Sequence, residues 1–313
     1  MGYKEQDSDR AALRARRASS FGSQAAIYAE HRPDYPAASV RWALEPLGGR
    51  DAPVVLDLGA GTGKLTEGLL AVGAEVIAVE PDDAMRAELV RRFPGVTALS
   101  GTAEAIPLAD RSVDAVVAGQ AFHWFDQERA FPEIARVLRA DGVFAAFWNR
   151  DNDQVPWVVG LQRVMLSDAS FEPRKGSIRR PTHPLLTEFE HAEFDHTHRR
   201  TAESLTATIG THSHTVVISE TQRAELLDRI HTYLSRTPET ADGEFDFPLR
   251  TDVLRAKTAR RRAGMIPKVD TTTRAGRIAL VVVGPLITRH SGEHRPRSPR
   301  HHCLVIDCPG QVS

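Results

Sequence analysis

The chain has 313 residues, of which 41% are hydrophobic and 26% are charged, a balance typical of a globular protein with a buried core. Its formal net charge of −1 at pH 7 argues against a nucleic-acid binder that acts through overall charge. Two cysteines, no signal-peptide pattern and no apolar run of about 18 residues lead us to expect a cytoplasmic protein without membrane contact.

From residue 54 to residue 148 the chain alternates apolar runs with helical patterns. A helical repeat of apolar residues precedes the last run, and Asp141-Gly142 is expected to end that helix. Near-continuous apolar strands separated by helices predict an α/β fold, an open doubly wound sheet with helices on both faces. The expected strands are 54–58, 75–80, 96–101, 113–119 and 142–148.

Beyond residue 150 the pattern is looser, and the segments there are expected to complete the sheet and cover its ligand pocket. In chain order they are a helix over 155–169, a strand over 189–201, a helix over 220–236 and a strand over 243–257.

We expect three parts, and a change in charge marks the last of them. Residues 1–50 are expected to form a helical cap and residues 51–256 the main domain. Residues 257–313 contain eleven Lys or Arg against three Asp or Glu, and we expect this basic tail to be disordered.

The stretch VLDLGAGTGKLTEGLL at residues 55–70 has the order strand, glycine turn, helix. A phosphate loop of the G-x-x-x-x-G-K type needs a glycine where Leu58 stands and Ser or Thr where Leu65 stands. A dinucleotide fingerprint needs a third small residue where Lys64 or Thr66 stands. Both patterns fail, and D-x-G-x-G-x-G remains.

Asp57 stands at the end of the first strand, directly before this glycine turn. A carboxylate there would repel a pyrophosphate but suits a ligand with a cationic amine. S-adenosylmethionine carries an ammonium beside a sulfonium, so it is the cofactor that we expect.

At these motifs the chain resembles the class I S-adenosylmethionine-dependent methyltransferases. That resemblance implies a Rossmann-like fold with a mostly parallel seven-stranded sheet, in which Glu80 accepts the ribose hydroxyls and Thr102 or Glu104 meets the adenine amino group. FGSQAAIYAEHRPDYP is similar to a segment of small-molecule members such as trans-aconitate methyltransferases, in which Tyr28 and Arg32 close over the cofactor. The implied cofactor site comprises Tyr28, Arg32, Asp57, Gly59, Ala60, Gly61, Gly63, Glu80, Pro81, Ala103, Glu104 and Gln120.

GQAFHWF at residues 119–125 follows the fourth expected strand, where an acceptor would lie. His123 is a candidate general base, since the ordinary histidine pKa is about 6.5. The alternative is a histidine packed between Phe122 and Trp124. The run of Asn or Asp, Pro, Pro and an aromatic residue that marks nucleic-acid amino methylation is absent.

No metal site is expected. His191, His196 and His198 lack further ligands at a convincing spacing, so they predict a solvated strand face. Cys303 and Cys308 lie in the tail, which shows no sign of a core.

Two functions remain at this point. The first is methyl transfer to a small-molecule acceptor, with a carboxylate as one candidate because Arg32 would pair with it. The second is a non-catalytic protein that binds nucleic acid or an acidic partner through the tail, although the tail has no aromatic residues for base stacking. Nucleic acid is therefore not the expected partner, and the oligomeric state is left open.

Overall fold

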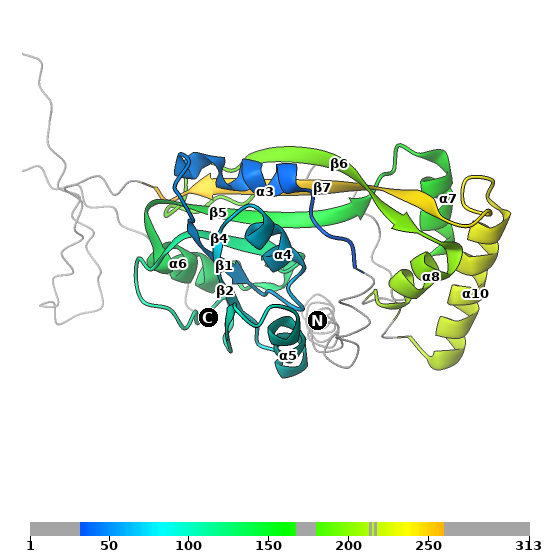
Figure 1. Cartoon of the computed structure of the whole chain (residues 1–313), viewed down its shortest axis with the longest axis horizontal. Helices are drawn as coiled ribbons and strands as arrows, with labels where there is room; N and C mark the ends of the chain where they lie inside the picture. Colours follow the sequence, from blue (N-terminus) through cyan, green and yellow to red (C-terminus); the bar gives the residue numbers. More distant parts are fainter. Residues whose placement is uncertain (1–31, 167–179, 213–214, 216–217, 260–313) are drawn as a thin grey trace, which may run out of the picture. The chain divides into compact units, whose positions relative to one another are not determined.

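The computed structural model describes residues 32–166, 180–212, 215 and 218–259 (Figure 1). These residues belong to the compact unit Met1–Ala259, and they form a seven-stranded sheet of order β3-β2-β1-β4-β5-β7-β6. The first five strands pair in parallel, and β7 runs antiparallel to both of its neighbours. The expected doubly wound, mostly parallel sheet is confirmed. Its strands are β1 (Val54–Leu58), β2 (Glu75–Val79), β3 (Thr97–Leu99), β4 (Val113–Gly119), β5 (Leu138–Asp151), β6 (Glu190–Arg200) and β7 (Phe245–Lys257).

Two apolar clusters pack on opposite faces of the sheet because strand side chains alternate. On one face Val55, Val117 and Phe147 meet helices α3 (Ala37–Leu44), α4 (Lys64–Ala71) and α5 (Asp83–Arg92). On the other face Leu56, Val116 and Phe144 meet α6 (Gln127–Val137). Two short 3₁₀ turns, η2 (Glu45–Leu47) and η3 (Phe122–Trp124), complete this part.

A third apolar cluster lies at the far end of the β6–β7 pair (Figure 1). It joins β7 to the helices α7 (Pro156–Val164), α8 (Ala202–Gly210) and α10 (Glu220–Arg236). The Tyr233 hydroxyl donates to the Trp157 carbonyl at 2.7 Å, directly over Gly160, where any Cβ would overlap that hydroxyl. None of the described helices is long and apolar enough to span a membrane.

The expectation that Asp141-Gly142 ends a helix is wrong. Helix α6 stops at Val137, and Leu138 already pairs with Val113 in the sheet. Asp141 has a φ of 61°, and a Cβ on Gly142 would lie 2.8 Å from the Arg139 carbonyl. Asp141 therefore takes a left-handed conformation inside an irregular start of β5, where no helix ends.

The backbone pairing of β7 continues past residue 256, where the sequence suggests that the domain ends. The Lys257 N–H donates to Thr187 Oγ1 at 3.0 Å and the Thr187 N–H donates to the Lys257 carbonyl at 2.9 Å. The Thr258 N–H donates to the Gly142 carbonyl at 2.9 Å, and the compact unit extends to Ala259.

We therefore expect a chain cut after Ala259 to keep the stability of the full-length fold. A chain cut after Ala256 should lose about 2 kcal/mol, because at least three hydrogen bonds worth about 0.5 to 1.5 kcal/mol each disappear. Urea unfolding of both truncations beside the full chain checks this. Equal stability of the two truncations would contradict it.

Candidate active site

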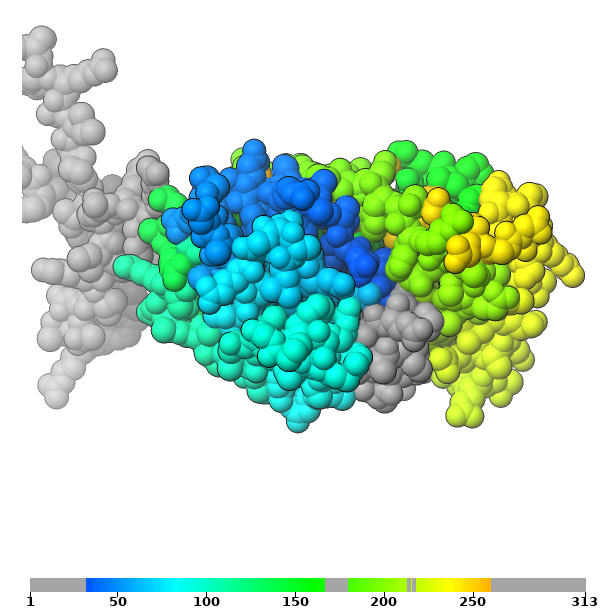
Figure 2. Space-filling view, in the orientation of Figure 1, coloured from blue at the N-terminus to red at the C-terminus, as the bar shows by residue number. Residues whose placement is uncertain are grey.

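A cavity of ≈ 340 Å³ opens at the carboxyl ends of the parallel strands, which is where open α/β sheets bind ligands. Residues that follow β1, β2, β3 and β4 line one half of it, and residues of β5, β6, β7 and α8 line the other. In Figure 2 the described chain starts (blue) beside the surface of α8 (light green). The cavity is thus enclosed by segments that are far apart in sequence.

The glycine turn after β1 shapes the floor of the first half. Gly59, Gly61 and Gly63 have φ angles of 71°, 56° and 86°, in the left-handed region that favours glycine. A Cβ on Gly61 would meet no atom within 4 Å, so the backbone of this cavity-lining residue borders open space. A ligand can therefore approach the Gly61 backbone closely.

Asp57 has an incompletely satisfied carboxylate at the end of β1. The Thr66 hydroxyl donates to Oδ2 at 2.7 Å, whereas buried Oδ1 has no hydrogen-bond partner among the described residues. Burial raises the pKa of this carboxyl to about 7, because the charged form loses its water. A cationic group in the cavity would satisfy Oδ1 and favour the charged form.

The Glu80 carboxylate follows β2 and holds two turns together. Oε2 accepts from the Gly61 N–H at 2.8 Å and Oε1 accepts from the Asp82 N–H at 3.0 Å. Glu80 lines the cavity beside Pro81, and burial raises its pKa. Each carboxylate oxygen keeps a further lone pair that a ligand hydroxyl could use.

Most of the other residues expected at the cofactor also line the cavity, but Gly63 does not, and a Cβ there would lie 2.7 Å from the Phe93 ring. Glu104 Oε1 accepts from the Asp126 N–H at 2.8 Å, which anchors this side chain. Gln120 has a φ of 54° and donates from Nε2 to the Asn149 carbonyl at 2.7 Å, so its left-handed backbone is held in place at the end of β4. The remaining cavity-lining residues of the expected cofactor set are Ala60, Thr102 and Ala103.

Two predicted residues belong to the N-terminal segment. Arg32 lines the cavity, and its Nη2 donates to the Thr211 carbonyl at 3.1 Å, just after α8. Tyr28 lies outside the described residues, so its expected position over the cofactor stays a prediction.

His123 is exposed on η3 and is not among the residues that line the cavity. The Trp148 indole donates to its Nδ1 at 3.4 Å, and its ring lies 4.7 Å from the ring of Trp124. Trp124 itself lines the cavity. These contacts favour the packed alternative at Trp124, with Trp148 as a further aromatic neighbour, and a catalytic role for His123 stays a prediction.

The prediction of a solvated face for the β6 histidines is wrong for all three, since His191 is only 15% exposed and lies against Asp252. His196 and His198 are half-buried on the inner face of the strand, and His198 lines the cavity. Burial lowers the pKa of His198 to about 4. The signal in the sequence was Phe194, an aromatic residue two positions before His196 and therefore on the same face.

Asp151 and Arg200 also line the cavity, and the sequence reasoning missed both. Asp151 lies at the end of β5, where burial raises its pKa to about 6 while Gln162 and Arg32 act to lower it. Its position at the carboxyl end of a predicted parallel strand was a usable signal.

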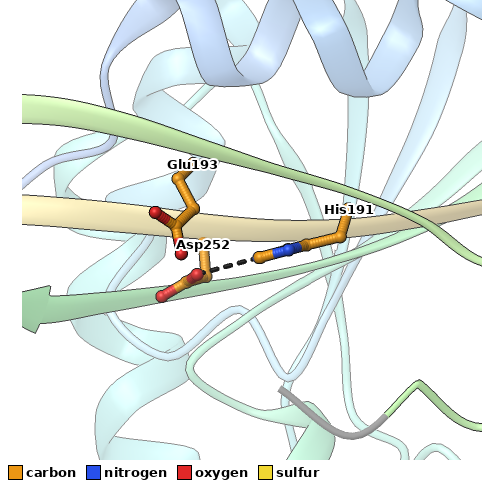
Figure 3. A group of neighbouring side chains, drawn as sticks. All are labelled: His191, Glu193 and Asp252. Carbon is orange, nitrogen blue, oxygen red and sulfur yellow. Dashed lines mark hydrogen bonds and ion pairs between the residues drawn. The ribbon is translucent and has the colours of Figure 1, made fainter. Parts of the chain in front are cut away.

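Figure 3 shows the one group of three ligand-type side chains that the described residues bring close enough for a metal ion: His191, Glu193 and Asp252. The Arg150 guanidinium already binds both carboxylates of this group. Its Nε donates to Asp252 at 2.5 Å and its Nη2 donates to Glu193 at 3.0 Å. His191 Nε2 lies 2.9 Å from Asp252. With both carboxylates neutralised by Arg150, the group is an ion-pair network and offers little to a cation.

Known proteins share this arrangement of motifs and strands. The family described as a methyltransferase domain matches residues 56–146. An uncharacterized methyltransferase from Mycobacterium bovis is 37% identical over 241 residues, covering 77% of this chain and 96% of that protein. A malonyl-[acyl-carrier protein] O-methyltransferase from Methylococcus capsulatus is 42% identical over 98 residues, covering 29% of this chain and 35% of that protein.

A solved structure agrees with these sequence matches. It is a proposed type II methyltransferase from Anaeromyxobacter dehalogenans, 28% identical with a TM-score of 0.53, and the match covers 72% of this chain and 97% of that chain. Together with the glycine turn and the strand order, these matches show that the chain belongs to the class I S-adenosylmethionine-dependent methyltransferases.

Proposed function

We propose that this chain is an enzyme that transfers the methyl group of S-adenosylmethionine to a small-molecule acceptor in the cytoplasm. The observation that carries the proposal is the buried, unpartnered Oδ1 of Asp57, a residue that lines the cavity beside a glycine turn that leaves open space. A ligand with an ammonium group fits that oxygen, whereas a pyrophosphate would meet its negative charge.

The other residues fit the remaining parts of such a donor. Glu80 would accept the ribose hydroxyls, and Thr102 or Glu104 would lie along the adenine. Arg32 would pair with a carboxylate, either of the donor or of the acceptor. When bound, the donor supplies an electrophilic methyl group, so the protein has to align the two reactants and exclude water.

An acceptor that carries a carboxylate is the class we propose from the charge of the second half of the cavity. Arg32 and Arg200 both line it, and Arg200 is buried, with only 7% of its surface exposed. The relative from Methylococcus capsulatus is named as an O-methyltransferase, which supports transfer to oxygen. Closer similarity to trans-aconitate methyltransferases stays a prediction.

The rival proposal, a non-catalytic protein that binds nucleic acid or an acidic partner, depends on the tail at residues 257–313. Almost all of that tail lies outside the described residues. The described residues favour the enzyme, because they form a cavity with groups suited to the donor.

The donor assignment predicts selective binding by the full-length protein. We expect S-adenosylmethionine and S-adenosylhomocysteine to bind in the micromolar range, about −8 kcal/mol, and NAD and ATP to bind far more weakly. Calorimetric titration with all four ligands checks this. Tight binding of NAD with no response to either methionine derivative would overturn the proposed function.

Glu80→Ala should weaken binding of S-adenosylhomocysteine by roughly 2 to 4 kcal/mol, because two charged hydrogen bonds of about 1.5 to 3 kcal/mol each are lost. Glu75→Ala is the matched control, since this exposed glutamate begins β2, the strand that Glu80 follows. Equal affinities of the two variants, both folded by circular dichroism, would remove Glu80 from the donor site.

Binding of S-adenosylhomocysteine should also strengthen as the pH rises toward 7. Asp57, with its pKa near 7, carries a proton below that pH, and a bound ammonium favours the charged form, so binding releases the proton. The affinity should rise by up to tenfold per pH unit between pH 5.5 and 7 and then level off. Asp57→Asn should bind more weakly, with a flatter profile. Parallel profiles of the two proteins in calorimetry would contradict the role of Asp57.

A further inference from the structure

The order of the strands divides the cavity between donor and acceptor. The residues proposed to hold the donor follow β1, β2, β3 and β4, which are neighbours in the sheet. Across the sheet from β4, the cavity wall continues with β5, then β7, then β6. The acceptor therefore faces this second half, whose apolar lining is Met165, Leu205, Ile209, Phe247 and Leu249.

Asp151 is the one carboxyl-bearing residue that the described chain contributes to this second half. It is the last residue of β5, and its register partner in β7 is the cavity-lining Leu249. Arg32 and the side chain of Gln162 are the groups that act on its charge. The proposed donor site does not include Asp151, since its two carboxylates are Asp57 and Glu80, at the ends of β1 and β2.

We propose that Asp151 is the general base of this enzyme, which accepts the proton of an acceptor hydroxyl group. This inference rests on the proposed function and narrows its substrate class to molecules that react through a hydroxyl. The O–H bond breaks and its proton moves to the Asp151 carboxylate. The oxygen electron pair forms the bond to the methyl carbon, and the sulfur leaves as a thioether with the electrons of the broken C–S bond.

The surroundings of Asp151 favour this role over recognition of a reacting carboxylate. A carboxylate has no proton to lose, and it would meet the negative charge of Asp151. The pKa of Asp151, raised by burial to about 6, lies nearer to neutral pH than that of His198 at about 4, so Asp151 is the stronger base of the two. His123 does not line the cavity.

Arg32 and Asp151 together suggest a hydroxy acid. Both line the cavity, and the positive charge of Arg32 acts to lower the pKa of Asp151. In a hydroxy acid Arg32 would hold the carboxylate while Asp151 faces the hydroxyl. The acceptor of the proposed function then binds through its carboxylate and is methylated on its hydroxyl oxygen.

The first test is turnover by the full-length protein with a panel of aliphatic and phenolic hydroxy acids, each beside its deoxy analogue. We expect S-adenosylhomocysteine release only with hydroxy acids, and mass spectrometry should place the methyl group on the hydroxyl oxygen. Asp151→Asn should lower that turnover by about 10² to 10⁴. Asp153→Asn is the matched control, because it removes an exposed carboxylate that lies two residues after Asp151 and pairs with Arg150.

The second test needs no turnover. The coloured phenol 4-hydroxy-3-nitrophenylacetate is bound to protein loaded with S-adenosylhomocysteine, and its phenolate absorbance is followed against pH. The charge of Asp151 should give the bound phenol a higher apparent pKa in the wild type and in Asp153→Asn than in Asp151→Asn.

Equal phenol pKa values in all three proteins, or equal turnover by Asp151→Asn, would overturn the proposal. Methyl esters instead of ethers, or no turnover with any hydroxy acid, would overturn it as well. The donor titration keeps these failures distinct, since the proposed function fails only where S-adenosylmethionine itself does not bind.

Discussion

The active-site end of this sheet depends on one carboxylate. Glu80 accepts the backbone N–H of Gly61 from the turn after β1 and the N–H of Asp82 from the turn after β2. A side chain that satisfies two backbone donors links the two turns, in addition to the Gly59 and Ala60 N–H groups that donate to the Val79 carbonyl at 2.8 and 3.2 Å. Without Glu80, the Gly61 N–H would lose its hydrogen-bond acceptor at the cavity.

An electrostatic contrast runs along the cavity. Asp57 and Glu80 are buried at the donor half, where desolvation raises the pKa of both. The acceptor half contains Arg32 and Arg200, and burial there lowers the pKa of Arg200. Because burial disfavours the charged forms of Asp57, Glu80 and Arg200, a ligand group of opposite charge gains more beside each of them than it would at an exposed site.

The sequence predicted the lining of the first half of the cavity well and that of the second half poorly, for a physical reason. Strands β1 and β4 and the glycine turn are local patterns, and Val54–Leu58 and Val113–Gly119 match the expected ranges. The left-handed turn at Asp141 was missed because Asp-Gly is typical of helix ends and of tight turns alike.

The acceptor half is built from contacts that no local pattern contains. Thr251 donates to Asn149 Oδ1 at 2.5 Å and lies 3.0 Å from His196 Nε2, so one hydrogen-bonded row joins β5, β7 and β6. Asn149 in turn donates to the Asp34 carbonyl at 3.0 Å. The sequence does not show that β5, β7 and β6 are neighbours, so it predicted a solvated surface for the histidines of β6.

The separate apolar cluster of α7, α8 and α10 has an evolutionary consequence. It shares no buried residue with the two clusters that pack on the faces of the sheet, although β7 runs through both regions. Mutations in these helices can therefore reshape the wall that meets the acceptor without loosening the packing beneath the donor. A lineage could change the molecule it methylates while the methylating machinery stays intact, and the same helices are where a protein engineer would graft a new specificity.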